Sequence, residues 1–175
     1  MKQANVGTIA LRAVSDAELV VGTHEIGDSN AGPEVDEYLK SVGLPPGNPW
    51  CAAFVVFRLT KAAHELGLTI RSDFPRTGYT PTLAGFFKNN NLWTPASARN
   101  PLMIARGDLC FFYFAAEGRI GHVGMVTGID GDGIHTIEGN TSGGSGVDRN
   151  GGGVYQKVRS FENFGTRGGF GRVPF

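Results

Sequence analysis

The sequence has 175 residues, of which 41% are hydrophobic and 18% charged, as in an ordinary globular protein. Its 16 basic and 16 acidic side chains cancel, and no block of Lys or Arg stands out, which argues against nucleic acid as a partner. No apolar run approaches the ~18 residues of a membrane span, and the start of the chain lacks the pattern of a signal peptide. We therefore expect one domain over residues 1–175, synthesised in the cytoplasm and without membrane contact.

The first half of the chain is patterned for helices. Ser15 with Glu18 three residues later forms a capping-box pattern, which predicts a helix start at Ser15. Between residues 33 and 43, Pro33 suits a first helical position and Gly43 follows the end. The apolar residues of this segment recur at helical spacing, so we predict an amphipathic helix here.

The longest predicted helix runs from Cys51 to Leu66 and is ended by Gly67. Its first two turns are apolar on nearly every side, which predicts a buried helix rather than a surface one. Thr80-Pro81 predicts a short fourth helix, and residues 91–106 are irregular and interrupted by proline.

The second half is patterned for strands, because short runs rich in Val, Ile, Thr and aromatic residues alternate with Gly/Asp clusters. These runs cover residues 108–114, 122–129, 134–140 and 154–160. The last residues, 170–175, are predicted to return as an edge strand, since Pro174 is tolerated only near an edge. Helices followed by an antiparallel sheet indicate an α+β domain.

Cys51 stands at the predicted start of the buried helix. The free N–H groups there create a positive local field, which favours a nucleophilic thiolate and can hold a developing oxyanion. Taken alone, a cysteine in an apolar helix is usually inert packing. Cys110, the other cysteine, lies in an apolar strand and is interpreted as packing; a disulfide between the two stays open.

A nucleophilic thiol needs a base, and the base needs an orienting group. His122 opens one predicted strand, and Glu138 and Asn140 lie two apart on the next, so the latter two are expected on one face. Each has an ordinary structural interpretation by itself, but the combination favours catalysis. His24, His64 and His135 are interpreted as structural or surface residues.

The turn at residues 130–133 decides whether the three side chains meet. A three-residue loop pairs even-numbered residues with even-numbered ones and places His122 on the same face as Glu138. A two-residue turn would place Glu138 on the opposite face. We predict the three-residue loop or an equivalent bulge.

No Cys/His spacing suits zinc, and the Asp/Asn pattern at residues 27–32 lacks a complete calcium loop. We expect no metal and no cofactor.

The stretches "NPWCAAFV", "RGDLCFFYF" and "GHVGMVTGIDGDGIHTIEGNT" resemble, in this order, the CHAP family (cysteine, histidine-dependent amidohydrolases/peptidases). The resemblance runs from about His24 to Thr141. It implies a papain-like fold of the NlpC type and cleavage of a peptidoglycan amide, at the muramoyl–alanine bond or within the stem and cross-bridge peptides. By resemblance, Cys51 is the nucleophile, His122 the base and Glu138 its orienting group, with Asn140 assisting.

One departure concerns the oxyanion. Papain-like relatives carry a glutamine before the cysteine, and this sequence has none there, so the Cys51 N–H needs another partner, for which Asn48 is a weak candidate. Gly121 adjoins His122 and is expected to contact substrate. Trp50 adjoins Cys51 and is interpreted either as a wall of the substrate groove or as core packing. Glu25 is retained as a minor site candidate because it falls in the matching region.

The expected partner is a peptidoglycan peptide, and we expect a monomer. The protein acts on the cell wall either as a phage lysin or as an antibacterial effector with an immunity protein; the sequence does not choose between them. Two further functions stay open: acyl transfer by the same thioester, and an inactive wall-binding or phage structural module.

Overall fold

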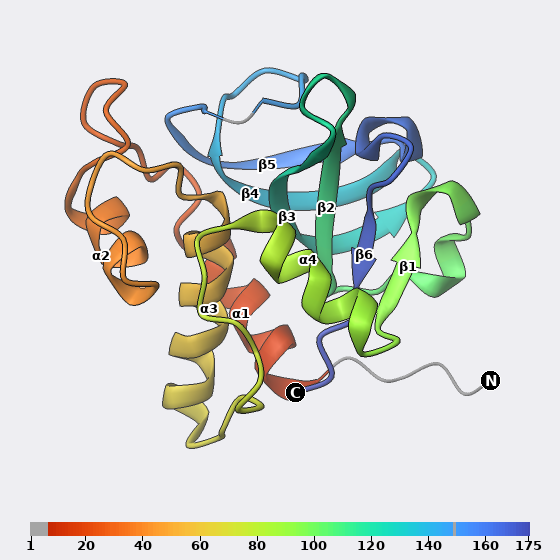
Figure 1. The fold of residues 1–175 in the computed structure, drawn as a ribbon, viewed down its shortest axis with the longest axis horizontal. Coiled ribbons are helices and arrows are strands. Elements are labelled where there is room, and N and C mark those ends of the chain that lie inside the picture. Colours follow the sequence, from red (N-terminus) through yellow and green to blue (C-terminus); the bar gives the residue numbers. More distant parts are fainter. Residues whose placement is uncertain (1–6, 149) are drawn as a thin grey trace.

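The structure is a computed structural model that describes residues 7–148 and 150–175 (Figure 1). Within these ranges the helices come first in the chain. They are α1 (Thr8–Glu18), α2 (Pro33–Ser41), α3 (Cys51–Leu66) and α4 (Thr80–Asn89). The strands are β1 (Trp93–Pro95), β2 (Leu109–Phe114), β3 (Arg119–Asp130), β4 (Gly133–Thr141), β5 (Gly153–Arg159) and β6 (Gly169–Gly171). The predicted α+β class, with N-terminal helices and a C-terminal antiparallel sheet, is confirmed.

Three of the predicted helices are confirmed. Pro33 opens α2, and Gly67 closes α3 in the left-handed conformation that glycine adopts at low cost. The predicted start at Ser15 is wrong, because α1 begins at Thr8 and Ser15 lies in its second half. The helix instead follows an apolar face that begins upstream, at Ile9, and Ser15 Oγ donates to the Leu11 carbonyl at 3.2 Å.

The strands form one sheet in the order β1-β6-β2-β3-β4-β5, with antiparallel neighbours. The short strand β1 lies in the segment that we expected to be irregular. The predicted edge position of the last strand is wrong: β6 is paired on both sides, by β1 and β2. Because β6 ends at Gly171, Pro174 lies beyond the ladder and needs no edge.

In the β3–β4 hairpin even-numbered residues pair with even-numbered ones near His122, as predicted, and a bulge rather than a three-residue loop is the cause. Asp130 pairs with Gly133, so the turn has two residues and not three. A bulge at Thr127 then shifts the register, and Val126 pairs with Thr136. Even-numbered residues are thereby paired again from Val126 towards the start of β3, where His122 lies.

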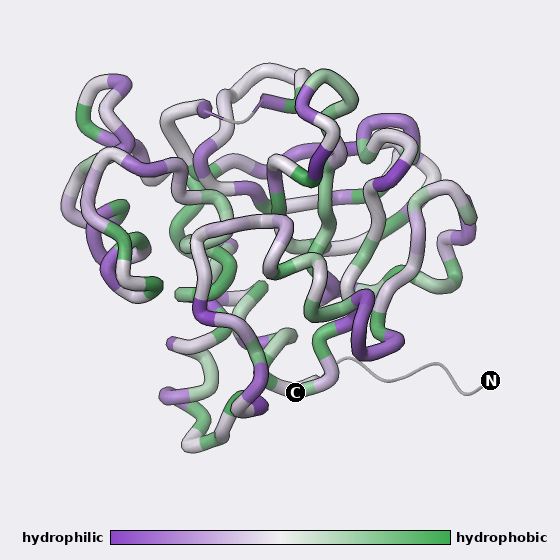
Figure 2. The backbone as a smooth tube through the Cα atoms, in the orientation of Figure 1, coloured by the Kyte–Doolittle hydropathy of each residue, from purple (hydrophilic) through white to green (hydrophobic). Residues whose placement is uncertain are grey.

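Hydrophobic side chains cover both faces of the sheet. Helices α1 and α3 pack on one face, and α2 packs on α3 (Figure 1). Gly139 of β4 shows how close this approach is, since a Cβ there would lie 2.8 Å from the rings of Trp50 and Phe54. On the opposite face a smaller cluster forms around Phe112, Phe164 and Phe170. Strongly hydrophilic stretches lie mostly in the connecting loops (Figure 2).

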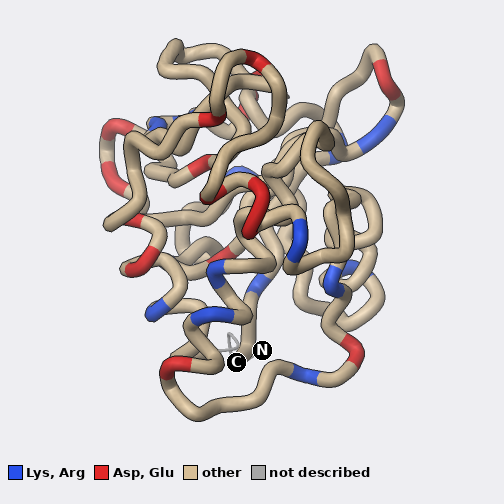
Figure 3. The backbone as a smooth tube through the Cα atoms, turned by 90° about the vertical axis from the view of Figure 1, so that its left-hand side faces the viewer, with Lys and Arg blue, Asp and Glu red and all other residues tan. Residues whose placement is uncertain are grey.

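Charges of both signs are interspersed on the side of the molecule shown in Figure 3, in keeping with the zero net charge of the sequence. Within the two described ranges, no helix is both long enough and apolar enough to cross a bilayer.

Candidate active site

Cys51 is the first residue of α3 and lines a groove of about 340 Å³. Its side chain is nearly buried, with 3% of the residue exposed. Trp50, at the N-cap, provides no side-chain cap, so the N–H groups of the first turn have no side-chain partner from this position. The thiol therefore lies where the positive end of a 16-residue helix meets a groove.

Asn140 fixes the position of this helix start. Its Oδ1 accepts the backbone N–H of Trp50 at 3.1 Å, and its Nδ2 donates to Asn30 Oδ1 and to the Gly151 carbonyl. A φ of 57° at Asn140 coincides with the irregularity in the β4–β5 register and turns the residue out of the regular strand. The expectation that Asn140 shares a face with Glu138 and assists at His122 is therefore corrected: its side chain bonds to the backbone before Cys51.

The structure brings His122 and Glu138 into direct contact. His122 Nε2 lies 3.0 Å from Glu138 Oε2, and both side chains are wholly buried. Because a carboxylate only accepts, Nε2 carries the proton of this hydrogen bond. Nδ1 is buried and has no hydrogen-bond partner in the part of the chain that the structure describes, so this nitrogen is the one that can accept a proton from another group.

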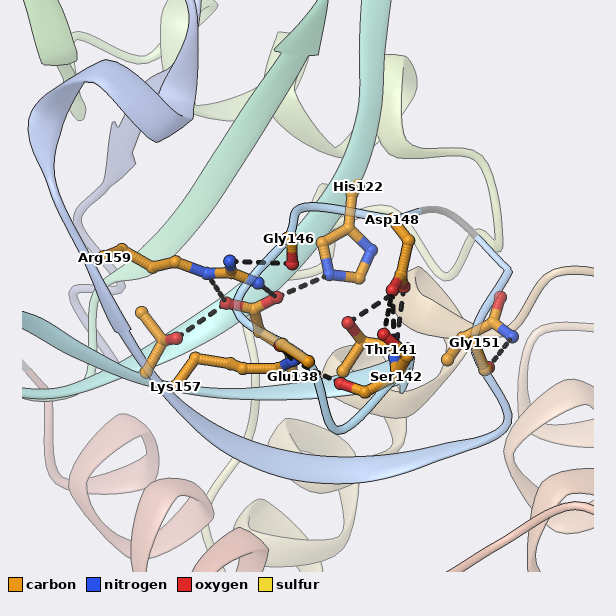
Figure 4. A network of polar contacts seen from close by, with 12 residues as sticks. His122, Glu138, Thr141, Ser142, Gly146, Asp148, Gly151, Lys157 and Arg159 are labelled. Carbon is orange, nitrogen blue, oxygen red and sulfur yellow. Dashed lines mark hydrogen bonds and ion pairs between the residues drawn. The ribbon is translucent and has the colours of Figure 1, made fainter.

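Arg159 joins the candidate site in the structure, and the sequence did not point to it. From β5 its Nε and Nη2 donate to the two oxygens of Glu138 at 2.8 and 2.7 Å, in the two-point geometry of an arginine–carboxylate pair (Figure 4). Thr136 Oγ1 adds a third hydrogen bond, to Glu138 Oε1 at 2.7 Å. Glu138 thus links His122 on β3 to Arg159 on β5, and its orientation is fixed from three sides.

The pKa values of the pair move apart in the directions that these contacts require. Burial alone would lower the pKa of His122, but the interactions with the Cys51 thiol and the Glu138 carboxylate outweigh it and raise the pKa to about 9. Burial alone would raise the pKa of Glu138, but hydrogen bonds from Arg159 and His122 lower it to about 2. At neutral pH this favours an imidazolium that faces an ionised Glu138.

These shifts predict a pH dependence of stability. His122 binds its proton more tightly when folded, so its contribution is complete below pH ~6.5 and is lost as the pH rises through about 9. Glu138 binds its proton less tightly when folded, so its contribution is complete above pH ~4.5 and is lost as the pH falls through about 2. Both contributions are complete between pH ~4.5 and pH ~6.5, and we expect urea denaturation to show the highest free energy of unfolding there.

The variant Cys51→Ala provides the control for this profile. It removes one of the two residues that raise the pKa of His122, so the alkaline loss of stability is expected to begin at lower pH. NMR titration of the His122 ring measures the same shift directly. A wild-type His122 that titrates at its ordinary pKa would contradict this prediction.

The loop after β4 is tied to the same network. Arg159 Nη1 donates to the carbonyls of Ser145 and Gly146 at 2.8 and 2.9 Å. Asp148 accepts the backbone N–H of Ser142 at 3.1 Å, and its carboxylate closes the loop on itself (Figure 4). One guanidinium therefore holds both the carboxylate behind His122 and the glycine-rich segment beside it.

The predicted substrate contacts divide into two groups. Asn48 and Gly121 line the groove together with Cys51, and Asn48 Nδ2 donates to the carbonyl of Pro45 within its own loop. Trp50 is wholly buried and does not line the groove, so of its two interpretations the structure supports core packing and not substrate contact. Its ring packs on Tyr38 and Phe54.

Glu25 supports Trp50 and does not line the groove. It accepts the indole N–H of Trp50 at 3.2 Å. Both residues therefore stabilise the segment that leads into Cys51.

The remaining candidates lie outside the groove. Cys110, which like Cys51 is a free thiol, lies buried in β2, and burial raises its pKa well above its ordinary value. His135 is partly exposed and pairs with Asp130 at 2.9 Å. His64 is exposed near the end of α3. Among residues 7–148 and 150–175, no group of three or more His, Cys, Asp or Glu side chains is placed to hold a metal ion.

A family model for the CHAP domain matches residues 43–140, which is more than half of the chain and includes Cys51, His122 and Glu138. No curated protein and no solved structure matches the chain. The helix-start cysteine, the strand-borne histidine and the carboxylate behind it all fall within the matched span, and the chain belongs to the CHAP family, a family of peptidoglycan amidases and peptidases.

Proposed function

We propose that the protein is a peptidoglycan hydrolase that cleaves an amide bond by a Cys51–His122–Glu138 thiol mechanism, within one catalytic domain. The observation that carries the proposal is the bonding of the buried His122. Its Nε2 is hydrogen-bonded to Glu138, its Nδ1 has no hydrogen-bond partner among the described residues, and Cys51 is near enough to raise the pKa of the ring. A structural histidine of this burial would be expected to have both nitrogens satisfied. An inactive wall-binding module would need none of this arrangement.

Before the substrate reacts, His122 Nδ1 already holds the proton of Cys51, and the two side chains form a thiolate–imidazolium pair. The thiolate attacks the amide carbon, and the carbonyl oxygen becomes an oxyanion. The imidazolium then gives its proton to the leaving amine as the C–N bond breaks, which leaves a thioester on Cys51. Water, deprotonated by the now neutral His122, attacks the thioester and releases the carboxylate product together with the thiol.

The N–H groups of the first turn of α3 are proposed to hold the oxyanion. They begin at Cys51 and carry the positive end of the helix field. The bond between Asn140 and Trp50 fixes the direction of this turn, which assigns Asn140 a positioning role. Glu138 and Arg159 keep the ring of His122 in one orientation throughout.

The direct test is digestion of purified peptidoglycan with mass spectrometry of the soluble fragments. We expect new amine and carboxylate ends at one class of amide bond, and that class distinguishes an amidase from an endopeptidase. An added amine should not appear in the products if water is the acceptor; its incorporation would indicate acyl transfer. Fragments identical to those of a Cys51→Ala digest would contradict the proposal.

We further propose that the protein reaches the cell wall after synthesis in the cytoplasm, by release or delivery, and that it acts there as a monomer.

A further inference from the structure

The groove beside Cys51 has a chemical character that the catalytic residues do not explain. Two of its walls come from the loop after α2 and from residues 76–80, and Arg119 and Gly121 of β3 complete it. Its lining includes two arginines, Arg76 and Arg119, while none of the described lining residues is Asp or Glu. The charged side chains that line the groove beside Cys51 are therefore both positive.

Arg119 is held in place on the groove wall. Its Nη2 pairs with Glu117 at 3.0 Å, its Nη1 donates to the Ile120 carbonyl at 3.3 Å, and its guanidinium carbon lies 5.8 Å from the centroid of the Tyr79 ring. Glu117 neutralises part of this charge. The contacts also restrict the guanidinium to one region, so the side chain loses less conformational entropy when a ligand binds it.

Arg76 provides the uncompensated charge. It is exposed, and its side chain makes no ion pair or hydrogen bond with any residue within the described ranges. Tyr79, which is 53% exposed, follows three residues later on the same segment and lies against Arg119. An arginine without a protein partner on a groove wall suits a ligand that brings its own anion.

We propose that Arg76 and Arg119 bind a free carboxylate of the substrate, so that the groove selects a peptide with an anionic group close to the scissile amide. The proposal rests on the function proposed above and narrows its substrate class. Guanidinium groups bind carboxylates through paired, charge-assisted hydrogen bonds, and a carboxamide of the same shape cannot replace them.

Two small alkylating reagents test the proposal without any peptidoglycan. Iodoacetate carries a carboxylate where iodoacetamide carries a neutral carboxamide of nearly the same size, and alkylation of Cys51 by either reagent is measured by peptide mapping. We expect the rate with iodoacetate divided by the rate with iodoacetamide to be higher at Cys51 than with a free cysteine derivative. In the double variant Arg76→Gln/Arg119→Gln, the ratio should fall about tenfold, as expected for the loss of charge-assisted contacts. Arg167→Gln, an exposed arginine outside the groove lining, should leave it unchanged.

A second arm uses two stem peptides that differ only in whether one carboxyl group is free or amidated. Wild type should cleave the free acid about tenfold faster, and the double variant should lose this preference while it still cleaves the amidated peptide. Equal losses on both peptides, or a reagent ratio that ignores both arginines, would overturn the inference. A ratio that depends on the arginines, with neither peptide cleaved, would retain the anion site and refute the proposed hydrolase. If Cys51 reacts with neither reagent, both proposals fail.

Discussion

Cys51→Ala should abolish hydrolysis of peptidoglycan while leaving the fold intact. Loss of the nucleophile removes the thioester route, and an enzyme that depends on such a route loses roughly 10⁴- to 10⁶-fold in kcat. The side chain is small and borders the groove, so its truncation leaves only a minor packing defect. The measurement is the loss of turbidity of a cell-wall suspension, with circular dichroism to confirm folding.

Cys110→Ala is the matched control, because it removes the only other cysteine of the chain from a buried strand. Its thiol has no role in the proposed mechanism, and we expect activity to be retained at a modest cost in stability. Activity that survives in Cys51→Ala, or that is lost equally in both variants, would show that the thiol of Cys51 is not the nucleophile.

Arg159→Met is expected to damage both stability and catalysis. The substitution leaves the carboxylate of Glu138 buried with its main cationic partner removed, and breaking such a buried pair typically costs about 3–5 kcal/mol. The hydrogen bonds from Arg159 are the largest influence that lowers the pKa of Glu138, so that pKa should rise. Without the two hydrogen bonds from Arg159, Glu138 holds the ring of His122 less firmly, and kcat should fall more than KM changes. Chemical denaturation and steady-state kinetics measure the two effects.

The double variant Arg159→Met/Glu138→Gln separates these effects. It removes the unpaired charge together with the arginine, so stability should return in part, whereas activity should not. Arg159→Lys keeps the charge but loses the two-point geometry and is expected to lie between wild type and Arg159→Met. Full activity in Arg159→Met would refute the positioning role of Arg159.

The sequence predicted most of the fold because its signals are local. Pro33, Gly67 and the Thr80-Pro81 pair mark helix ends through their own backbone preferences, and the structure places ends there. The failure at α1 has the opposite cause. A capping-box pattern at Ser15 was present, but burial of an apolar face that begins at Ile9 determined the helix. Tertiary packing outweighed a weak local preference.

The parts of the candidate site that depend on regular alternation of side chains along strands were predictable. The pairing that places His122 and Glu138 on one face was predicted to come from a three-residue loop or a bulge, and the bulge at Thr127 produces it. Asn140 was misplaced because a left-handed φ interrupts the alternation, which no neighbouring residue signals. Arg159 was missed because its partner lies on another strand, 21 residues away, and only the assembled sheet shows the pair.

The most direct test of the account is the rate at which iodoacetamide alkylates Cys51 as a function of pH, in wild type and in His122→Gln. The thiolate is the form that reacts, and a Cys51 that gives its proton to His122 is expected to react faster at neutral pH than the same thiol in His122→Gln. The substitution removes the proton acceptor, so the rate at neutral pH should fall. Identical pH profiles in the two proteins would contradict the central claim that Cys51 and His122 act as one pair.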